Sequence, residues 1–167
     1  MSAPDKNRTV RTFILTISDT RTKETDKSGK LMQELLEANG HKIIGREIVP
    51  DELHNIQRVV RERSVDKHID VILTNGGTGM AFRDVTIEAI QPLLDKEMPG
   101  FGEMFRTLSY YEDIGSSAIM SRAVAGITNH TPIFVTPGSS GAVKLAMEKL
   151  ILKEIVHIVH EAQKDLP

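Results

Sequence analysis

The residues best suited to chemistry form a glycine-rich turn, Thr74-Asn75-Gly76-Gly77-Thr78-Gly79, which directly follows an apolar run. Its three glycines within four positions allow positive φ angles and let backbone N–H groups converge with no Cβ atom in the way. Such a concavity binds anions, above all phosphate. Arg83 and Asp84 follow the turn and add a positive charge and a carboxylate beside the predicted anion site. The alternative is a tight turn whose glycines serve only its geometry.

Neither of the two best-known glycine fingerprints describes this turn. The P-loop pattern ends in Gly-Lys-Ser/Thr, and no lysine stands at the end of this loop. The dinucleotide pattern Gly-x-Gly-x-x-Gly begins at Gly77-Thr78-Gly79, but Phe82 occupies its last position. The turn therefore predicts a phosphate site of another kind, at the junction of a strand and a helix.

A second glycine turn, Pro137-Gly138-Ser139-Ser140-Gly141, separates another apolar run from the last helical segment. Because the carboxyl ends of parallel strands meet at one edge of a sheet, both turns would present N–H groups and positive helix ends there. Two neighbouring anion sites suit a ligand with more than one phosphate, or a phosphate donor beside its acceptor. Taken alone, however, this turn is better explained as a helix start with Ser139 or Ser140 as the N-cap.

Two carboxylates, Asp51 and Asp84, are candidates for holding a magnesium ion near these phosphates. Mg²⁺ typically takes one or two protein carboxylates together with phosphate oxygens. Each aspartate also stands at a predicted helix start, where N-capping is the ordinary explanation. That explanation is stronger for Asp51 than for Asp84, which follows the glycine turn. Ser18 and Asp19 come at the end of the first predicted strand, where ligands bind in open α/β sheets.

Covalent catalysis and zinc binding have little support in the sequence. Ser18, Ser121 and Ser139 show no spacing to His and Asp that indicates a nucleophilic triad. His157 and His160 stand at i and i+3 on a predicted helix and could share a metal, but zinc requires three or four protein ligands. Surface or interface positions are the favoured interpretation of both histidines.

Segments with strand and helix periodicity alternate along the chain. Apolar and β-branched runs predict strands over 10–18, 41–49, 69–73, 126–130 and 132–136. Apolar residues at helical spacing predict helices over 26–39, 53–60, 86–94, 104–108, 116–125 and 142–164. Residues 99–103, Pro-Gly-Phe-Gly-Glu, are predicted to interrupt this pattern. The alternation predicts an α/β fold with a mainly parallel sheet covered on both faces.

Length and composition indicate one ordinary globular domain. The chain has 167 residues, a net charge of −2 and no cysteine. No linker or repeat divides it, so we expect a flexible tail at 1–9 and a single domain at 10–167. The charge argues against a nucleic-acid surface, and the absence of cysteine excludes disulfides and thiolate chemistry. With no signal peptide and no apolar stretch of ~20 residues, we expect no membrane contact and a cytoplasmic location.

The last predicted helix carries apolar residues on most of its circumference. One stripe is suited to cover the sheet and contains Met147, Leu150, Ile151, Ile155 and Ile158. A second group on another side contains Leu152, Val156 and Val159. A helix that is apolar most of the way round is buried on most sides, so we predict a homo-oligomer that covers the second group. The alternative is that loops or the N-terminal tail cover it.

Several separated motifs occur in a fixed order along the chain. They are the glycine turn at 74–79, Arg83-Asp84-Val85-Thr86, Pro99-Gly100-Phe101-Gly102-Glu103, Ser121-Arg122-Ala123 with Ala125-Gly126, and Pro137-Gly138-Ser139. In this order they resemble the MoaB/MogA family of molybdenum cofactor biosynthesis proteins, from about the first strand to the last helix. The resemblance is closer to the MoaB branch, because Pro137-Gly138-Ser139-Ser140 replaces the Pro-Gly-x-Pro of many MogA-like members.

For fold and activity, the resemblance implies a three-layer α/β/α domain that binds molybdopterin and assembles as a trimer or a hexamer. MogA-like members adenylylate molybdopterin: its phosphate attacks the α-phosphorus of Mg-ATP, and pyrophosphate leaves. The resemblance thus implies molybdopterin and ATP as substrates, Mg²⁺ as the metal, and other molybdenum cofactor enzymes as further partners. Adenylyl transfer calls mostly for positioning and charge neutralisation, which agrees with the glycine turns and the carboxylates.

The resemblance and the sequence pattern together define a predicted site. Asp51 and Asp84 would be catalytic and would bind or orient Mg²⁺-ATP. The substrate- and nucleotide-binding positions would be Ser18, Asp19, Thr74, Asn75, Gly76, Gly77, Thr78, Gly79, Ser121, Arg122, Ala123, Pro137, Gly138, Ser139 and Ser140. Within this set the glycine turn and Ser139 would cradle phosphates, and Arg122 would add positive charge.

Two other functions stay open at this point. A protein of the same pathway could bind molybdopterin and present it without adenylylating it, because one fold serves different functions. The same magnesium and phosphate groups also suit hydrolysis of a nucleotide pyrophosphate. The presence of both Asp51 and Asp84 favours catalysis over binding alone.

Overall fold

A six-stranded sheet forms the middle layer of the structure, a computed structural model that describes residues 5–167. In spatial order the strands are β2 (Lys42–Val49), β1 (Arg11–Ile17), β3 (Val71–Asn75), β6 (Thr131–Thr136), β5 (Val124–Thr128) and β4 (Lys96–Glu97). The pairs β2–β1, β1–β3 and β3–β6 are parallel, whereas β6–β5 and β5–β4 are antiparallel. The predicted α/β fold with a mainly parallel sheet is therefore confirmed, with an antiparallel edge in addition.

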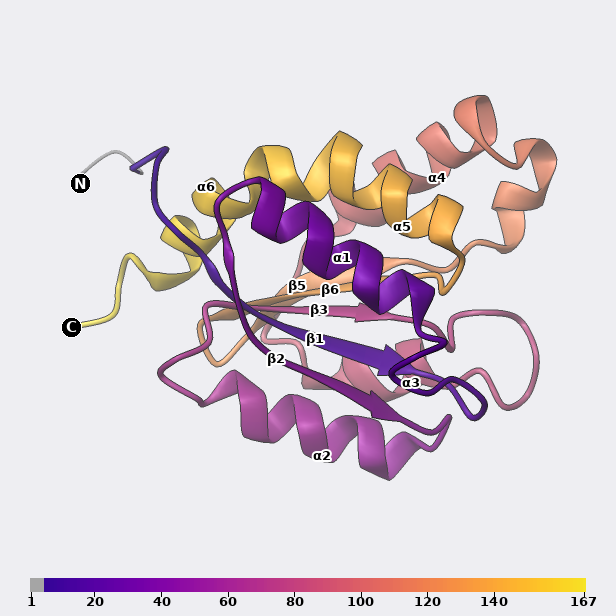
Figure 1. Cartoon of the computed structure of the whole chain (residues 1–167), viewed down its shortest axis with the longest axis horizontal. Helices are drawn as coiled ribbons and strands as arrows, with labels where there is room; N and C mark the ends of the chain where they lie inside the picture. The colour runs from indigo at the N-terminus through magenta and orange to yellow at the C-terminus, as the bar shows by residue number, and fades with distance from the viewer. Residues whose placement is uncertain (1–4) are drawn as a thin grey trace.

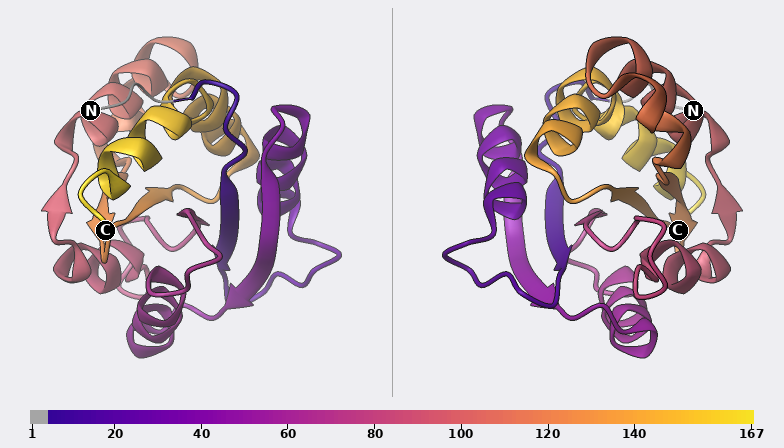
Figure 2. Two further views of the ribbon diagram at one scale, coloured as in Figure 1. Left: turned by 90° about the vertical axis from the view of Figure 1, so that its left-hand side faces the viewer. Right: turned by 90° about the vertical axis from the view of Figure 1, so that its right-hand side faces the viewer.

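Helices cover both faces of this sheet (Figure 1, Figure 2). One face carries α1 (Lys27–Ala38), α4 (Pro99–Glu112), α5 (Ser140–Ala146) and α6 (Leu152–Gln163). The other face carries α2 (Leu53–Ser64) and α3 (Thr86–Ile90). The arrangement is the three-layer α/β/α fold. Among the described residues, no helix combines the length and the apolar character that a bilayer crossing requires.

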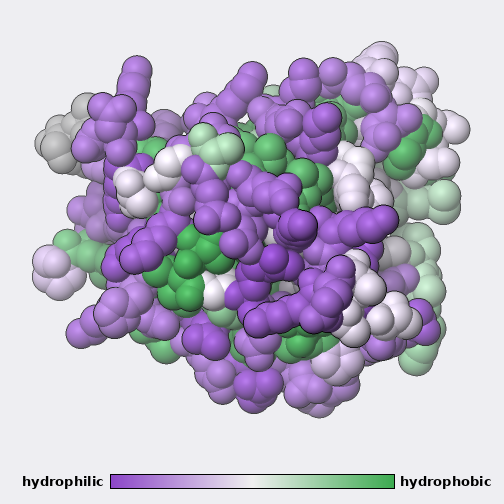
Figure 3. Space-filling view, in the orientation of Figure 1, coloured by the Kyte–Doolittle hydropathy of each residue, from purple (hydrophilic) through white to green (hydrophobic). Residues whose placement is uncertain are grey.

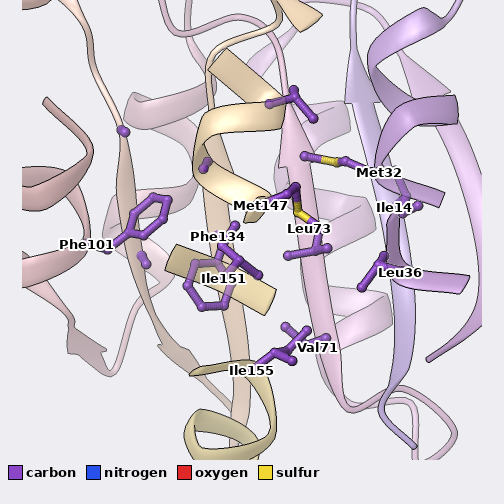
Figure 4. Close-up of a cluster of buried hydrophobic side chains, with 14 of the residues drawn as sticks. Ile14, Met32, Leu36, Val71, Leu73, Phe101, Phe134, Met147, Ile151 and Ile155 are labelled. Carbon is purple, nitrogen blue, oxygen red and sulfur yellow. The ribbon is translucent and has the colours of Figure 1, made fainter. Parts of the chain in front are cut away.

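Alternating side chains of the central strands enter two apolar clusters, one under each helical layer. Ile14 and Leu73 pack in the cluster that includes residues of α1 and α6 (Figure 4). Leu15 and Ile72 point to the opposite face and pack in the cluster that includes residues of α2 and α3. Successive side chains of a strand point to opposite faces. A central strand buried on both faces therefore needs apolar residues at nearly every position, as these runs have.

Two predicted helix boundaries change at prolines. The Pro-Gly-Phe-Gly-Glu motif does not interrupt the helical pattern, because α4 begins at Pro99. Proline is well placed at a first helical position, where its missing N–H would have no helical partner. The helix predicted over 86–94 is divided, since α3 ends at Ile90 and a 3₁₀ turn, Gln91–Leu93, contains Pro92. A proline inside an α-helix removes a hydrogen bond and clashes with the preceding turn.

The helix predicted over 116–125 is wrong. The segment is a 3₁₀ turn, Gly115–Met120, followed by three residues without regular secondary structure and then by β5. Ser121, Arg122 and Ala123 therefore lie in a loop rather than on a helix. Tertiary packing decides this outcome, because β5 pairs with β6 and with the short strand β4, which the sequence pattern does not predict. Gly126 permits the second pairing, since a Cβ atom there would overlap Lys96 O.

The last helix runs from α5 to α6 through a π-helical turn, Met147–Ile151. Its fully buried stripe contains Met147, Ile151, Ile155 and Val159. The assignment of Val159 to a second apolar group is therefore wrong. The remaining apolar residues are partly buried and pack against the same core: Leu150, Leu152, Val156 and Ile158. The helix thus leaves less apolar surface uncovered than its sequence predicts.

A buried carboxylate, Asp70, attaches the N-terminal segment to the sheet. Arg11 donates to it from its backbone N–H (2.9 Å), its Nε (3.1 Å) and its Nη2 (3.0 Å). Arg8 and Gln163 donate to its Oδ1, each at 3.3 Å. Burial opposes ionisation, but the hydrogen bonds from Arg11 hold the pKa of Asp70 below its usual value. Of the predicted tail at 1–9, residues 1–4 lie outside the described residues, and Arg8 makes this contact.

Replacing Asp70 by asparagine should destabilise the fold, because two arginines lose their charged partner. We expect the free energy of unfolding at pH 7, measured in urea, to fall by roughly 2 kcal/mol. The pKa of Asp70 is lowered in the folded state, so its contribution is complete above about pH 4 and is lost as the pH falls below that value. The difference between Asp70→Asn and the parent should therefore shrink at pH 3.

The exposed Arg58–Glu62 pair on α2 provides the matched control, Glu62→Gln. An exposed i, i+4 pair contributes little, so this control should shift the free energy of unfolding by no more than ~0.5 kcal/mol. Equal urea midpoints for Asp70→Asn and Glu62→Gln would contradict the role assigned to Asp70.

Candidate functional site

The first glycine turn lies at the carboxyl end of β3, between the neighbouring carboxyl ends of β1 and β6. Gly76 and Gly77 have positive φ angles of 97° and 67°. A Cβ atom on Gly76 would overlap Ile17 O, and one on Gly77 would overlap Thr86 Oγ1. Both the backbone conformation and the available space therefore require glycine at these two positions.

Hydrogen bonds from neighbouring elements hold the carbonyl oxygens of this turn. Thr86 donates from Oγ1 to Gly76 O (2.9 Å) and from its N–H to Gly77 O (3.0 Å). Gly76 N–H in turn donates to Thr136 O (3.1 Å) at the end of β6. These contacts fix the turn from α3 on one side and from β6 on the other.

The N–H groups that follow are left unpaired. Within residues 5–167, the N–H groups of Gly77, Thr78, Gly79 and Met80 have no hydrogen-bond acceptor. A row of free N–H groups in a glycine turn is what an anion cradle provides. Gly79 and Met80 are exposed, so water can satisfy their N–H groups, whereas an unpaired N–H group at the buried Thr78 is uncommon. The arrangement supports the predicted phosphate site.

The second glycine turn lies directly against the first. A Cβ atom on Gly138 would lie 3.1 Å from Gly76 Cα, and Arg21 donates to Gly138 O at 2.9 Å. Ser139 caps α5, since its Oγ accepts from Ala142 N–H at 3.2 Å. The helix-start explanation is therefore confirmed for this turn. Its glycine and serine N–H groups nevertheless have no acceptor in the described part of the chain, so the turn can add donors to an anion site.

Asp51 and Asp84 do not cap the helices that follow them. The carboxylate of Glu52 caps α2, accepting from two N–H groups of its first turn at 3.2 and 2.8 Å. The first turn of α3 has no side-chain cap. The N-capping explanation is therefore wrong for both aspartates. Asp84 Oδ2 instead accepts from Ala81 N–H at 3.1 Å, inside the loop between β3 and α3.

Asp19, Asp51 and Asp84 form a carboxylate cluster beside the first glycine turn. Asp51 N–H donates to Asp19 Oδ1 at 2.8 Å. Asp51 Oδ1 is buried and has no hydrogen-bond partner among the residues described. Burial, and then repulsion from Asp19 and Asp84, raises the pKa of Asp51, which Arg83 opposes only in part. A buried carboxylate oxygen without a partner, close to two further carboxylates, fits a bound cation.

The carboxylate cluster suits a divalent cation whose remaining ligands come from a bound substrate. Across residues 5–167, no group of three or more His, Asp or Glu side chains is arranged to hold a metal ion. The protein can therefore supply one or two carboxylates, as in Mg²⁺ sites that phosphate oxygens complete. The same finding leaves the zinc alternative at His157 and His160 without the additional ligands that zinc requires.

The site is a cavity of about 540 Å³ at the carboxyl edge of the sheet. The predicted residues that line it are Ser18, Asp19, Asp51, Gly76, Gly77, Thr78, Gly79, Asp84, Ser121, Arg122, Pro137 and Gly138. The other predicted residues lie outside this lining. Thr74, Asn75 and Ala123 are buried, and Ser139 and Ser140 stand at the exposed start of α5. The fold thus brings most of the predicted site together from segments far apart in the sequence.

Several lining residues are absent from the predicted site. Arg21 stands in the polar segment after β1, and that position at a strand end is a signal that could have identified it. Ile114, Ser117 and Met120 come from the segment after α4 and form another part of the lining. No local pattern marks these three residues, because only the path of the chain after α4 brings them to the cavity.

Three arginines line the cavity, but they are not equally free to meet a ligand. Arg122 donates to the carbonyl oxygens of the glycine turn and to Glu88. Arg83 is 69% exposed, and its Nη1 lies 4.0 Å from Asp19. Arg21 is 31% exposed, its Nη2 donates to Gly138 O at 2.9 Å, and its Nη1 lies 3.9 Å from Asp26 Oδ1. Positive charge toward a ligand therefore comes from Arg21 and Arg83 more readily than from Arg122.

The chain resembles known proteins over most of its length. A family model described as "Probable molybdopterin binding domain" matches residues 13–157. "Molybdenum cofactor biosynthesis protein B" of Bacillus subtilis (strain 168) is 62% identical over 163 residues, covering 98% of this chain and 94% of the relative. A crystal structure of molybdenum cofactor biosynthesis protein B has a TM-score of 0.94 at 55% identity, covering 96% of this chain and 100% of the other. The crystal structure of the tungsten cofactor synthesizing protein MoaB from Pyrococcus furiosus has a TM-score of 0.82 at 37% identity, covering 93% of this chain and 98% of the other.

The substitution Gly77→Ala should remove the anion cradle. A methyl group at this positive φ angle would overlap Thr86 Oγ1 and approach Asp51 Oδ1, so the turn must open. In crystals grown with sulfate, we expect an anion on the N–H groups of residues 77–80 in the parent and none in the variant. The variant should also lose about 1–3 kcal/mol of stability, the range for a residue held in a strained backbone conformation.

Gly100→Ala is the matched control, because a Cβ atom at Gly100 meets nothing within 4 Å. Gly100 lies in α4, where alanine should be neutral or stabilise by up to ~1 kcal/mol. A parent structure with no anion at high sulfate, or a Gly77→Ala structure that keeps one, would count against the cradle.

Proposed function

This chain belongs to the family described as a probable molybdopterin binding domain and acts in molybdenum cofactor biosynthesis, and we propose that its step is the Mg-ATP-dependent adenylylation of molybdopterin. An oxygen of the molybdopterin phosphate forms a bond to the α-phosphorus of ATP. The bond from that phosphorus to the β-phosphate oxygen breaks, and pyrophosphate leaves. The observation that carries the proposal is the row of unpaired N–H groups beside a carboxylate cluster.

The two glycine turns suit a reaction between two phosphate-bearing substrates. They touch at Gly76 and Gly138, so anions held by their N–H groups would lie next to each other. Arg21 and Arg83 line the same cavity and can neutralise part of the phosphate charge. Transfer of this kind depends on positioning and electrostatic stabilisation rather than on a protein nucleophile. The residues that line this cavity include no histidine or lysine that could activate a serine nucleophile.

The carboxylate cluster would hold the magnesium ion of Mg-ATP. Bound Mg²⁺ supplies charge neutralisation and orientation of phosphate oxygens. Asp51 and Asp84 are the residues that would hold it, and Asp19 accepts from Asp51 N–H and so orients the backbone that carries Asp51. The pKa of Asp51 is raised in the absence of a cation. A bound cation would stabilise the ionised carboxylate and so lower this pKa.

Asp84→Asn should abolish adenylyl transfer and leave the fold intact. Asparagine keeps the oxygen that accepts from Ala81 N–H but removes the charge next to the cradle. We expect the rate with purified protein, molybdopterin and Mg-ATP to fall about 100-fold or more, with an unchanged thermal midpoint. Pyrophosphate and adenylylated pterin should be measured together. The control is Asp165→Asn, since the Asp165 side chain is 78% exposed and does not line the cavity.

The products of this assay separate the proposal from its alternatives. Pyrophosphate with an equal amount of adenylylated pterin supports adenylyl transfer. Nucleotide cleavage without adenylylated pterin would indicate hydrolysis of a nucleotide pyrophosphate. Pterin binding with neither product would indicate a protein that presents molybdopterin to another enzyme. Full activity of Asp84→Asn would remove Asp84 from the mechanism.

The same proposal includes a homo-oligomer, a trimer or a hexamer. The face formed by α1, β2 and α2 is mostly hydrophilic, with small apolar areas (Figure 3). Of the large apolar side chains that are exposed, five lie within a single segment that begins in the second half of α4: Tyr110, Tyr111, Ile114, Ile119 and Met120. The others, among them Met80, Phe82 and Met104, lie elsewhere along the chain. Exposed apolar side chains concentrated in this way are typical of association surfaces.

Light scattering at micromolar concentration measures the assembly directly. We expect a mass of several chains, each of 18.6 kDa, because association removes the apolar segment at 110–120 from water. The exposed substitution Ile119→Lys should lower the mass, whereas Val65→Lys, at an exposed position outside this segment, should not. A parent mass near 18.6 kDa would overturn this part of the proposal.

A further inference from the structure

The guanidinium of Arg122 is hydrogen-bonded to the backbone of the loop that carries the anion cradle. Its Nε donates to Thr78 O at 2.9 Å, and its Nη2 donates to Gly79 O at 2.8 Å and to Asp84 O at 3.1 Å. Glu88, on α3, receives hydrogen bonds from both Nη1 and Nη2. One side chain thus connects both ends of the loop between β3 and α3.

These contacts leave Arg122 with little capacity for a ligand. A guanidinium has five N–H donors in a fixed planar fork and no acceptor. Here Nε and Nη2 are used by three carbonyl oxygens, and Nη1 meets the carboxylate of Glu88. The hydrogen bond from Arg122 also lowers the pKa of Glu88, so this carboxylate stays ionised at neutral pH. Glu88 therefore neutralises the charge that Arg122 would otherwise present to a phosphate.

The geometry of the peptide bond connects this clamp to the cradle. In a trans peptide, the C=O and the N–H of one planar unit point in opposite directions. The unit that carries Thr78 O also carries Gly79 N–H, and the unit that carries Gly79 O carries Met80 N–H. Both N–H groups belong to the set that has no acceptor within the described chain. By drawing the two carbonyl oxygens toward itself, Arg122 turns these two donors away and keeps them available.

We infer that Arg122 and Glu88 are positioning residues that hold the glycine loop in its anion-binding conformation, and that Arg122 does not itself bind phosphate. The inference rests on the proposed phosphate site and assigns a role to Glu88, which no sequence motif marks. Glu88 acts through Arg122, and Arg122 acts through the N–H groups of Gly79 and Met80. The same clamp fixes the backbone of Asp84 and so the position of its carboxylate beside the cavity.

The variant Glu88→Gln distinguishes this inference from direct phosphate binding by Arg122, because the two predict opposite changes in anion affinity. If Arg122 were a phosphate ligand, Glu88→Gln would release its guanidinium and remove a nearby negative charge, and anions would bind more tightly. If Arg122 is a positioning residue, Glu88→Gln loosens the clamp, the N–H groups lose their common orientation, and anions bind more weakly. Loss of the negative charge of Glu88 by itself also favours tighter anion binding. Weaker binding by the variant is therefore explained only by the loss of the loop conformation that Arg122 and Glu88 hold.

Isothermal titration of the full-length protein with inorganic pyrophosphate provides the test, at constant ionic strength and without molybdopterin. We expect Glu88→Gln and Arg122→Lys each to weaken binding by about tenfold or more, since each loses charge-assisted hydrogen bonds. Lysine keeps the charge of Arg122 but cannot reach three carbonyl oxygens at once. Glu62→Gln, in the exposed Arg58–Glu62 pair of α2, is the matched control and should bind like the parent.

Each outcome decides the inference. Weaker binding by both variants, with thermal midpoints close to that of the parent, supports it. Tighter or unchanged binding by Glu88→Gln, or parent-like binding by Arg122→Lys, overturns it while leaving the phosphate site in place. A parent that binds no pyrophosphate overturns the phosphate site and this inference together. The measurement involves no turnover, so it stands apart from the question of adenylyl transfer.

Discussion

The close approach of three strand ends at Gly76 is the constraint on which the site depends. Gly76 lies between Ile17 O, at the end of β1, and Gly138, in the turn after β6, with no room for a side chain. Its N–H is used by Thr136 O, so the backbone itself joins β3 to β6 at this point. Parallel pairing brings these ends to one edge of the sheet, and the glycines allow them to touch. The cradle, the second turn and the carboxylates all take their positions from this contact.

The buried carboxylate of Asp70 and the half-buried carboxylate of Asp51 lie in opposite electrostatic environments. Asp70 is surrounded by donors from Arg11, Arg8 and Gln163, and its pKa is lowered. Asp51 has a buried oxygen without a partner, stands close to other carboxylates, and its pKa is raised. The arrangement around Asp70 stabilises the folded chain, whereas the ionised form of Asp51 is unfavourable in the absence of a bound cation. Carboxylates with a raised pKa in a cavity are typical of functional sites, and the partner we propose for Asp51 is a cation that accompanies a phosphate.

The short helix α3 couples the apolar core to the polar loop. Its buried face, which includes Ile87 and Ile90, packs in the cluster under the sheet. Its other side chains reach the loop, Thr86 through Gly76 O and Glu88 through Arg122. Helix packing therefore helps to set the position of the loop, and the N–H groups of residues 77–80 are not needed to hold it. Because contacts from α3 and Arg122 hold the loop, its N–H donors can stay unpaired although the turn is ordered.

The sequence by itself determined the features that local pattern controls. Apolar runs over 10–18 and 69–73 correspond to β1 and β3, and helical spacing over 26–39 corresponds to α1. The first glycine turn is also local in one respect, because the positive φ angles of Gly76 and Gly77 favour glycine whatever the surroundings. Since parallel strands share one carboxyl edge, the grouping of Asp19, Asp51 and Asp84 near these turns followed from the order of elements.

Only the tertiary structure decided what depends on contacts between distant residues. The segment at 116–125 has helical spacing, yet pairing with β4 and β6 makes its end a strand and places Ser121 to Ala123 in a loop. Arg122 looks like a free cation in the sequence, but its donors are used by Thr78 O, 44 residues away in the chain, and by Glu88. Asp51 and Asp84 look like helix caps, but Glu52 caps α2 and both aspartates belong to the cavity. Hydrogen bonds and close contacts of this kind have no period along the chain, so their outcome appears only when the packed backbone brings the partners together.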